Sequence, residues 1–242
     1  MRELIPQKYR IFLFFLLIAI LVGSFLLIFL NQSNISIPRK AKQIPSESFT
    51  FFEVGENTIL TKEKVRTLKK ALGQHRLENL TPVYLDFVRR GWLATHFPET
   101  QPLHDFFEKN RLRDPIASNT LKLTYRYAHQ KNVPFQNIHF VFSAYTNQPM
   151  SLFLRLPGRG EAIVSDLKTR YGEPRILDNA SVHGPGPTLV WKHKNDLLVV
   201  TILWDRYGKP ETHIFIAYLD NMKDFQKTIM KFYPEPGIRT GF

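Results

Sequence analysis

The chain has 242 residues, of which 43% are apolar, and it contains 20 Phe and 9 Tyr. This composition excludes an intrinsically disordered protein and predicts an ordered domain with a hydrophobic core. Cysteine is absent, which excludes disulfides, thiolate nucleophiles and cysteine-ligated metal sites, and the formal net charge of +12 raises the question of a nucleic-acid or membrane-surface partner.

An uncharged apolar run extends from Ile11 to Leu30. At about 1.5 Å per residue a helix of this length spans roughly 30 Å, which is the thickness of a bilayer's hydrocarbon core. The run is longer than the apolar core of a signal peptide, about 7–15 residues, and no small-x-small cleavage pattern follows it. It therefore predicts an uncleaved, single-pass transmembrane helix, and makes the lipid bilayer an expected partner.

Basic residues give the expected orientation of this helix. Lys8 and Arg10 adjoin the run on its N-terminal side, whereas Arg39 is the first basic residue after it. Because basic residues favour the cytoplasmic side, the large domain is expected outside the cytoplasm, facing the periplasm if the membrane is a bacterial inner membrane. The predicted organisation is a cytoplasmic tail over 1–10, a transmembrane helix over 11–30, a linker over 31–48 and an extracytoplasmic domain over 49–242.

Helical patterns dominate residues 61–112. Thr61 is a typical N-cap and Gly73 a typical C-cap, so a helix is predicted between them, with Val65, Leu68 and Leu72 on its buried side. Before this helix, a short strand is predicted over Phe49–Val54. After it, Thr81-Pro82 is predicted to open a second helix, whose buried stripe consists of Val83, Leu85, Val88, Trp92 and Leu93. A short third helix is predicted from Thr100 to about Arg111.

The pattern changes near 115–135, a possible sub-boundary, and residues 136–233 are rich in predicted strands. Leu121–Tyr127 alternates in the manner of a half-buried strand, although a helix from Asn119 to Gln130 is an alternative. The clearer predicted strands are 138–144, 150–156, 175–177, 188–193, 197–204 and 212–219. Tight links at 194–196 and 207–209 favour an antiparallel meander.

Two helices are predicted among these strands. One follows Gly158-Arg159-Gly160, which is read as a tight turn or, alternatively, as a phosphate cradle, and it ends at Gly172. The other is predicted to be capped by Asp220, with the apolar stripe Met222, Phe225, Ile229 and Phe232. The order of elements predicts an α+β domain in which helices cover one face of an antiparallel sheet.

Two surfaces are candidates for partner binding. The first is the basic face of the helix after Thr61, which either contacts lipid or a partner or is simply solvated. The second is a stiff, Gly- and Pro-rich loop, since surface loops often carry contacts. The candidate residues are Lys62, Arg66, Lys69, Lys70, His183, Gly184, Pro185, Gly186 and Pro187. No nucleic-acid-binding motif is present, so nucleic acid is not an expected partner.

No complete catalytic or cofactor motif occurs in the sequence, and none of the eight His forms an H-E-x-x-H pair. We therefore assign no catalytic, cofactor or metal residues. The leading hypothesis is a non-enzymatic, membrane-anchored subunit or assembly factor that binds proteins. The alternative is a tethered hydrolase that would align His183 or His193 with Asp205 or Ser181, and a ligand-sensing domain is a third reading.

Overall fold

A computed structural model describes residues 48–79, 83–109, 116, 118–177 and 186–233, and these belong to one compact unit. The predicted transmembrane helix over 11–30, the tail before it and nearly all of the linker lie outside the described residues. Within the part that the structure describes, no helix combines the length and apolarity needed to cross a bilayer.

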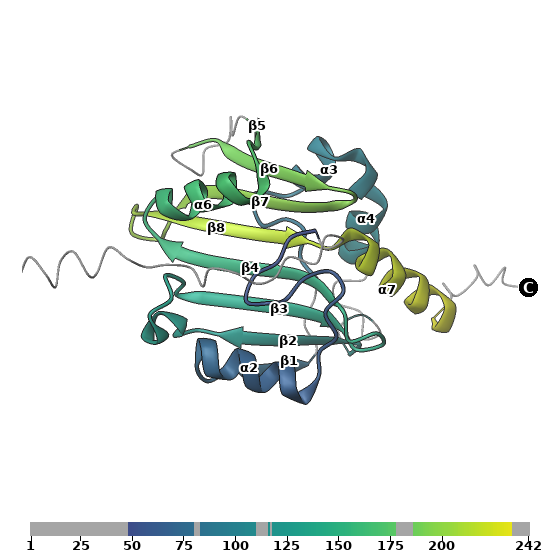
Figure 1. The fold of residues 1–242 in the computed structure, drawn as a ribbon. Coiled ribbons are helices and arrows are strands. Elements are labelled where there is room, and N and C mark those ends of the chain that lie inside the picture. Colours follow the sequence, from purple (N-terminus) through teal and green to yellow (C-terminus); the bar gives the residue numbers. More distant parts are fainter. Residues whose placement is uncertain (1–47, 80–82, 110–115, 117, 178–185, 234–242) are drawn as a thin grey trace, which may run out of the picture. The chain divides into compact units, whose positions relative to one another are not determined.

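The described residues are built around one antiparallel sheet of eight strands, in the order β1-β2-β3-β4-β8-β7-β6-β5 (Figure 1). The strands are β1 (Arg76–Asn79), β2 (Thr120–Tyr125), β3 (Asn137–Ser143), β4 (Pro149–Pro157), β5 (Arg175–Leu177), β6 (Thr188–His193), β7 (Asp196–Trp204) and β8 (Pro210–Ala217). The α+β class and six of the predicted strands are confirmed, and the stretch predicted over 121–127 forms the strand β2, which ends at Tyr125, instead of the alternative helix. The strand β1 was not predicted.

An internal repeat underlies this strand order. Helix α2 (Lys62–Leu72) leads into β1, and helix α6 (Glu161–Tyr171) leads into β5. Each helix ends at a glycine, Gly73 with φ 91° or Gly172 with φ 82°, whose N–H bonds to the carbonyl four residues earlier. Only glycine adopts this backbone region readily. The α2–β1 and α6–β5 junctions also share the sequence pattern Leu-Lys-x-x-x-Gly-x-x-Arg. The shared sequence pattern and the shared backbone conformation both indicate that the domain consists of two α-β-β-β-β repeats.

The registers of the strands locate a pseudo-twofold axis between β4 and β8, where Phe153 lies directly opposite Phe215. Equivalent rows extend outward from this pair. The first repeat contributes the row Phe153, His139 and Thr124, and the second contributes Phe215, Val199 and Val190. Directly opposed residues lie on one face of the sheet, so these six positions share a face.

Helices cover both faces of the sheet, which corrects the expected single covered face. The neighbours Leu198 and Val199 of β7 point to opposite faces, yet each is 0% exposed. On the face of Val199, called the α4 face, one hydrophobic cluster unites the strands with α3 (Trp92–His96), α4 (Gln101–Lys109) and α7 (Leu219–Phe232). The short helix η1 (Pro98–Thr100) connects α3 to α4. In Figure 1, α2 and α6 lie in front of the sheet, on the other face, with α3 behind it.

The predicted helix after Thr81-Pro82 is wrong for most of its length. Its apolar stripe is buried, as expected, but helix α3 begins only at Trp92, and Gly91 before it has φ 69°. Thr81-Pro82 itself lies outside the described residues. The predicted strand over 49–54 is also wrong, because Phe52 and Glu53 adopt positive φ and form a tight turn between Phe51 and Val54.

Helix caps gave mixed results. Thr61 Oγ1 accepts a hydrogen bond from the Lys64 N–H at 3.1 Å, which confirms the predicted cap of α2. Asp220, in contrast, lies inside the first turn of α7, and the helix begins one residue earlier. The first N–H of α7, at Leu219, instead donates to Asp196 Oδ1 at 3.1 Å, so the acceptor comes from β7. Phe232, predicted to be buried, is 61% exposed.

Candidate functional site

The outer edge of β6 is only half covered by its neighbour. β5 pairs with Thr188, Leu189 and Val190, and its first residue is Arg175. The residue before it, Pro174, has no N–H to donate, so the ladder ends there. Within the described part of the chain, Trp191, Lys192 and His193 therefore have a strand partner on the β7 side alone.

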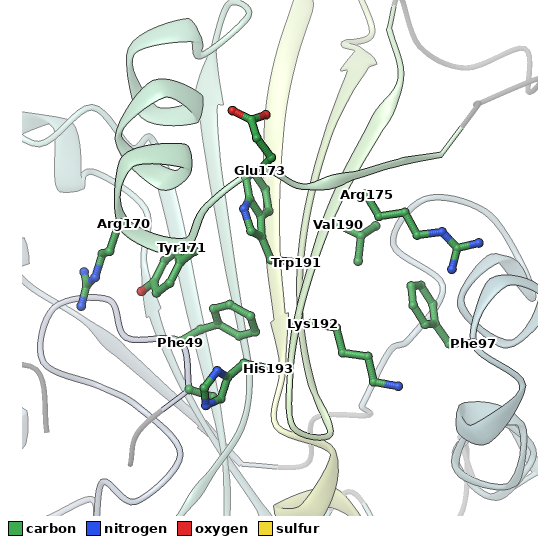
Figure 2. Close-up of a pocket in the computed structure, with 11 residues that line it drawn as sticks. Phe49, Phe97, Arg170, Tyr171, Glu173, Arg175, Val190, Trp191, Lys192 and His193 are labelled. Atoms are coloured by element: carbon green, nitrogen blue, oxygen red, sulfur yellow. The ribbon is translucent and has the colours of Figure 1, made fainter. Parts of the chain in front are cut away.

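A cavity of about 450 Å³ surrounds this unpaired edge, and we call it the edge groove (Figure 2). Its lining comes from the segment before α2, the α3–η1 junction, the end of α6, β5 and β6. The lining residues are Ser48, Phe49, Phe97, Arg170, Tyr171, Glu173, Arg175, Val190, Trp191, Lys192 and His193. Residues far apart in the chain thus converge on the last three residues of β6.

Aromatic side chains form the rigid part of the edge groove. The rings of Phe49 and Tyr171 meet edge to face, with centroids 5.1 Å apart, and His193 lies beyond Phe49 at 6.5 Å. Trp191 is 4% exposed, and its indole Nε1–H donates to the Gly172 carbonyl at 2.7 Å. This hydrogen bond connects the end of α6 to β6 and holds the Trp191 side chain in place in the wall of the groove.

The charge of the edge groove is positive. Its lining holds three Lys or Arg residues, Arg170, Arg175 and Lys192, against the single acid Glu173. Glu173 is itself paired with Lys168 outside the groove, at 2.8 Å, and Lys192 is paired with Glu99, at 2.5 Å, so Arg170 and Arg175 carry the surplus of positive charge. The pKa of nearby His96 is lowered by burial and then by the positive charges of Arg175 and Arg89, as expected beside a basic surface. An anionic partner would be attracted here.

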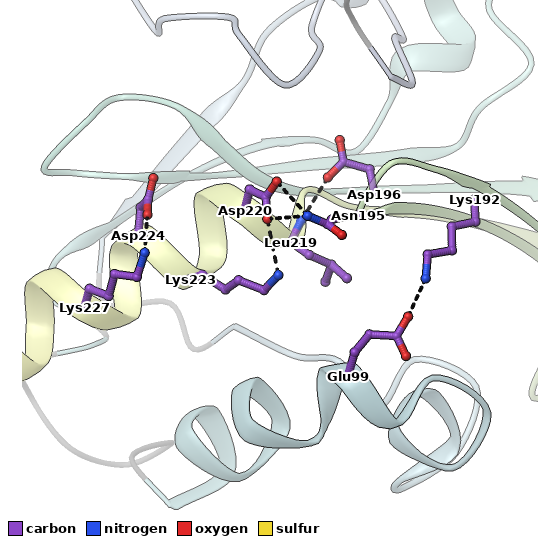
Figure 3. Close-up of polar contacts among 9 residues, drawn as sticks. All are labelled: Glu99, Lys192, Asn195, Asp196, Leu219, Asp220, Lys223, Asp224 and Lys227. Atoms are coloured by element: carbon purple, nitrogen blue, oxygen red, sulfur yellow. Dashed lines mark hydrogen bonds and ion pairs between the residues drawn. The ribbon is translucent and has the colours of Figure 1, made fainter.

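A network of polar contacts holds β6, β7 and α7 in place beside the groove (Figure 3). Lys192 Nζ lies 2.5 Å from Glu99 Oε1, which joins η1 to β6. Asp196, 2% exposed, accepts hydrogen bonds from the Leu219 N–H and from the hydroxyl of Ser48. Ser48 also lines the groove, so this buried carboxylate fixes the point at which the chain enters the domain.

The residues predicted from the sequence lie elsewhere. Lys62, Arg66, Lys69 and Lys70 are exposed on α2 and line neither the edge groove nor its surroundings. Gly186 and Pro187 precede the opposite end of β6, and His183, Gly184 and Pro185 lie outside the described residues. None of the described candidates lines the edge groove.

The geometry also separates the residues of the hydrolase hypothesis. His193 lines the edge groove, but Asp205 follows the far end of β7, roughly 30 Å away at about 3.3 Å per residue. Asp205 Oδ1 accepts hydrogen bonds from the N–H groups of Tyr207 and Lys209, as a turn residue does. Ser181 and His183 lie outside the described residues. Among the residues that are described, no three His, Asp or Glu side chains cluster as metal ligands would.

Comparison with protein-family models, with curated proteins and with solved structures finds no match for this chain.

Proposed function

We propose that this protein is a membrane-anchored subunit or assembly factor whose α+β domain binds an extended, acidic segment of a partner protein along the edge groove. The observation that carries the proposal is the unpaired edge of β6 at Trp191–His193, enclosed by aromatic and basic side chains. The membrane anchor of the proposal is the apolar run from Ile11 to Leu30.

An exposed sheet edge binds extended peptides through main-chain hydrogen bonds, while pockets on either side read alternate side chains. The edge groove offers two such sides (Figure 2). Phe49, Tyr171 and His193 lie on one side of β6, and Phe97, Arg175 and Lys192 lie on the other. A strand added here would place apolar residues against the rings and acidic residues against the cations.

The anchor is tested by fractionation of the full chain. We expect it to stay with membranes after carbonate washing and to be released when residues 1–30 are deleted. A C-terminal reporter that is active only outside the cytoplasm should be active. Activity of a cytoplasm-only reporter would contradict the proposed orientation, and release of the full chain by carbonate would contradict the anchor.

The partner is tested by photo-crosslinking in native membranes. A benzoylphenylalanine residue at position 193 of the full chain, which leaves Lys192 in place, should capture a partner protein, whereas the same probe at position 69, on the basic face of α2, should not. A crosslink from position 69 alone would place binding on α2 and refute the groove. A crosslink from position 193 to the chain's own linker would also contradict the proposal.

A charge exchange separates binding from folding. In the double variant Lys192→Glu with Glu99→Lys, the ion pair is kept while the groove side receives a negative charge. We expect the capture of the partner to fall at least tenfold, and the melting temperature to change by no more than about 2 °C, because an exposed pair contributes little to stability.

The matched control exchanges the 3.2 Å pair of Asp224 and Lys227 on the exposed side of α7. This double variant, Asp224→Lys with Lys227→Glu, should leave partner capture unchanged. An equal loss in both double variants would mean that the effect reflects general surface charge and would refute recognition by the groove.

A further inference from the structure

The two repeats differ sharply on the α4 face. In the second repeat, Leu197, Val199 and Ala217 lie in the hydrophobic cluster that includes α3 and α4. Their counterparts in the first repeat are polar: Asn137, His139 and Arg155. The first repeat has no helical insertion equivalent to α3 and α4 over these residues within the described part of the chain. Among the described residues, these polar side chains therefore line a surface cavity instead of a core.

This surface contains a second cavity, of about 510 Å³, which we call the polar cavity. It is lined by Glu78, Lys122, Thr124, Arg126, Tyr127, His129, Gln136, Asn137, His139 and Arg155. Three of these residues are Lys or Arg, and one is an acid. Glu78 is paired with Lys122 at 3.4 Å, and Arg155 Nη1 lies 3.7 Å from Glu211, which is outside the lining. Arg126 is the remaining cation of the lining, and its positive charge favours an anion.

Several polar atoms in the wall of the polar cavity are buried without a partner. Among the described residues, Arg155 Nε, Asn137 Oδ1 and Thr124 Oγ1 have no hydrogen-bond partner, and Thr124 is 3% exposed. Burying a polar atom without a hydrogen-bond partner is unfavourable, so such groups usually meet water or a ligand. Asn137 and Arg155 are directly opposed on β3 and β4, so one small molecule can reach both.

The chemistry of these atoms specifies the ligand. The Arg155 Nε–H can only donate a hydrogen bond, and Asn137 Oδ1 can only accept one. We infer that the polar cavity binds a small hydroxylated organic anion, such as a sugar acid or sugar phosphate, whose oxyanion accepts from Arg155 Nε–H and whose hydroxyl donates to Asn137 Oδ1. This site is separate from the edge groove and does not depend on the proposed partner.

His139 provides a spectroscopic readout of occupancy. Its pKa is lowered to about 4, first by burial and then by the positive charges of Lys122, Arg126 and Arg155, against an opposing effect of Glu78. A bound anion would offset those charges and raise the pKa of His139.

The test uses the full chain in non-ionic detergent micelles. D-gluconate and D-glucose 6-phosphate are titrated by calorimetry, with neutral D-glucose and propionate as partial mimics. In parallel, the resonance of His139 is followed in chain labelled with [13C]histidine and is assigned with His139→Gln. We expect saturable binding of at least one hydroxylated anion, at least tenfold tighter than D-glucose or propionate, and a higher pKa of His139 when it is bound.

Two substitutions and a control decide whether binding occurs in the polar cavity. Asn137→Leu introduces the residue type found at the equivalent position of the second repeat, and Lys122→Gln removes a cation at the rim. Each should weaken binding at least fivefold, whereas Arg206→Gln, in the exposed β7–β8 turn, should not. Binding that is unchanged in both cavity variants would overturn the inference. So would the absence of any heat or shift of His139 up to 50 mM probe, which would leave water as the only occupant.

Discussion

Replacing Asp196 by Asn is expected to stabilise the protein at neutral pH and to remove part of its pH dependence. Burial raises the pKa of Asp196 to about 6, against the hydrogen bonds from Ser48 and Leu219, which lower it. The folded chain therefore holds a proton that the unfolded chain releases near the ordinary aspartate pKa of 3.8. From this group alone, stability is highest below pH 4, falls as the pH rises from about 4 to 6, and stays low above that range.

The asparagine variant should avoid this loss. Its amide oxygen can still accept from the Leu219 N–H, and its NH₂ group can donate to Ser48. Each pKa unit corresponds to about 1.4 kcal/mol, so we expect a gain on the order of 2–3 kcal/mol in the free energy of unfolding at pH 8 and almost none at pH 4. Urea unfolding of the full chain in micelles at both pH values, followed by tryptophan fluorescence, measures this difference.

Asp220→Asn is the matched control, with the opposite sign. Burial raises the pKa of Asp220, but hydrogen bonds from Asn195 and Lys223 outweigh that effect and leave the pKa below its usual value. The ionised form therefore stabilises the fold above the unfolded pKa, and the variant should lose a few tenths of a kcal/mol at pH 8, because this side chain is largely solvated. If Asp196→Asn were also destabilised at pH 8, the buried charge would be a net stabilising group and our interpretation would be wrong.

Replacing Phe215 by Ala is expected to cost about 3–5 kcal/mol, whereas the same change at Phe153 should cost about 1–2 kcal/mol. The two residues occupy equivalent positions on either side of the pseudo-twofold axis. Phe215 is 3% exposed and stacks on Phe87 at 4.4 Å, within the cluster that includes α3 and α4. Phe153 is only partly buried, between the imidazoles of His139 and His213.

The comparison tests whether the α4 face is covered on one side of the axis only. Chemical unfolding of the two alanine variants and the wild type, with the full chain under one set of conditions, gives both losses of stability. Equal losses would mean that the first repeat is as well packed on this face as the second, and would contradict an open polar cavity.

Local sequence signals predicted the elements that depend on local physics. Thr61, Gly73 and Gly172 mark helix ends because side-chain caps and glycine conformations act within a few residues. The strands were recognisable because alternation and short apolar runs bounded by turns reflect the geometry of a strand itself.

Other predictions failed where buried side chains belong to a backbone that is not helical. Val83, Leu85 and Val88 are buried as the apolar stripe predicted, yet their backbone is irregular and the helix begins at Trp92. An apolar pattern indicates which side chains are buried, whereas tertiary packing determines the backbone conformation at these positions. The N–H at the start of α7 likewise found its acceptor at Asp196, which no local rule around Asp220 could indicate.

The candidate sites were the least predictable part. Trp191 is buried, and its position beside the half-paired edge of β6 depends on where β5 stops, a feature for which Pro174 was the signal in the sequence. Asn137 and Arg155 meet because two strands pair in one register, and Lys192 meets Glu99 across many intervening residues.

The sequence by itself determined an apolar run long enough to span a bilayer, an ordered α+β domain and most of its helix ends and strands, since these follow from composition, periodicity and caps. Only the tertiary structure decided that two repeats meet about an axis between β4 and β8, that both faces of the sheet carry helices, and that the described residues form an edge groove and a polar cavity. These features arise from strand order, register and the placement of one helical insertion, which are set by contacts between residues distant in the chain.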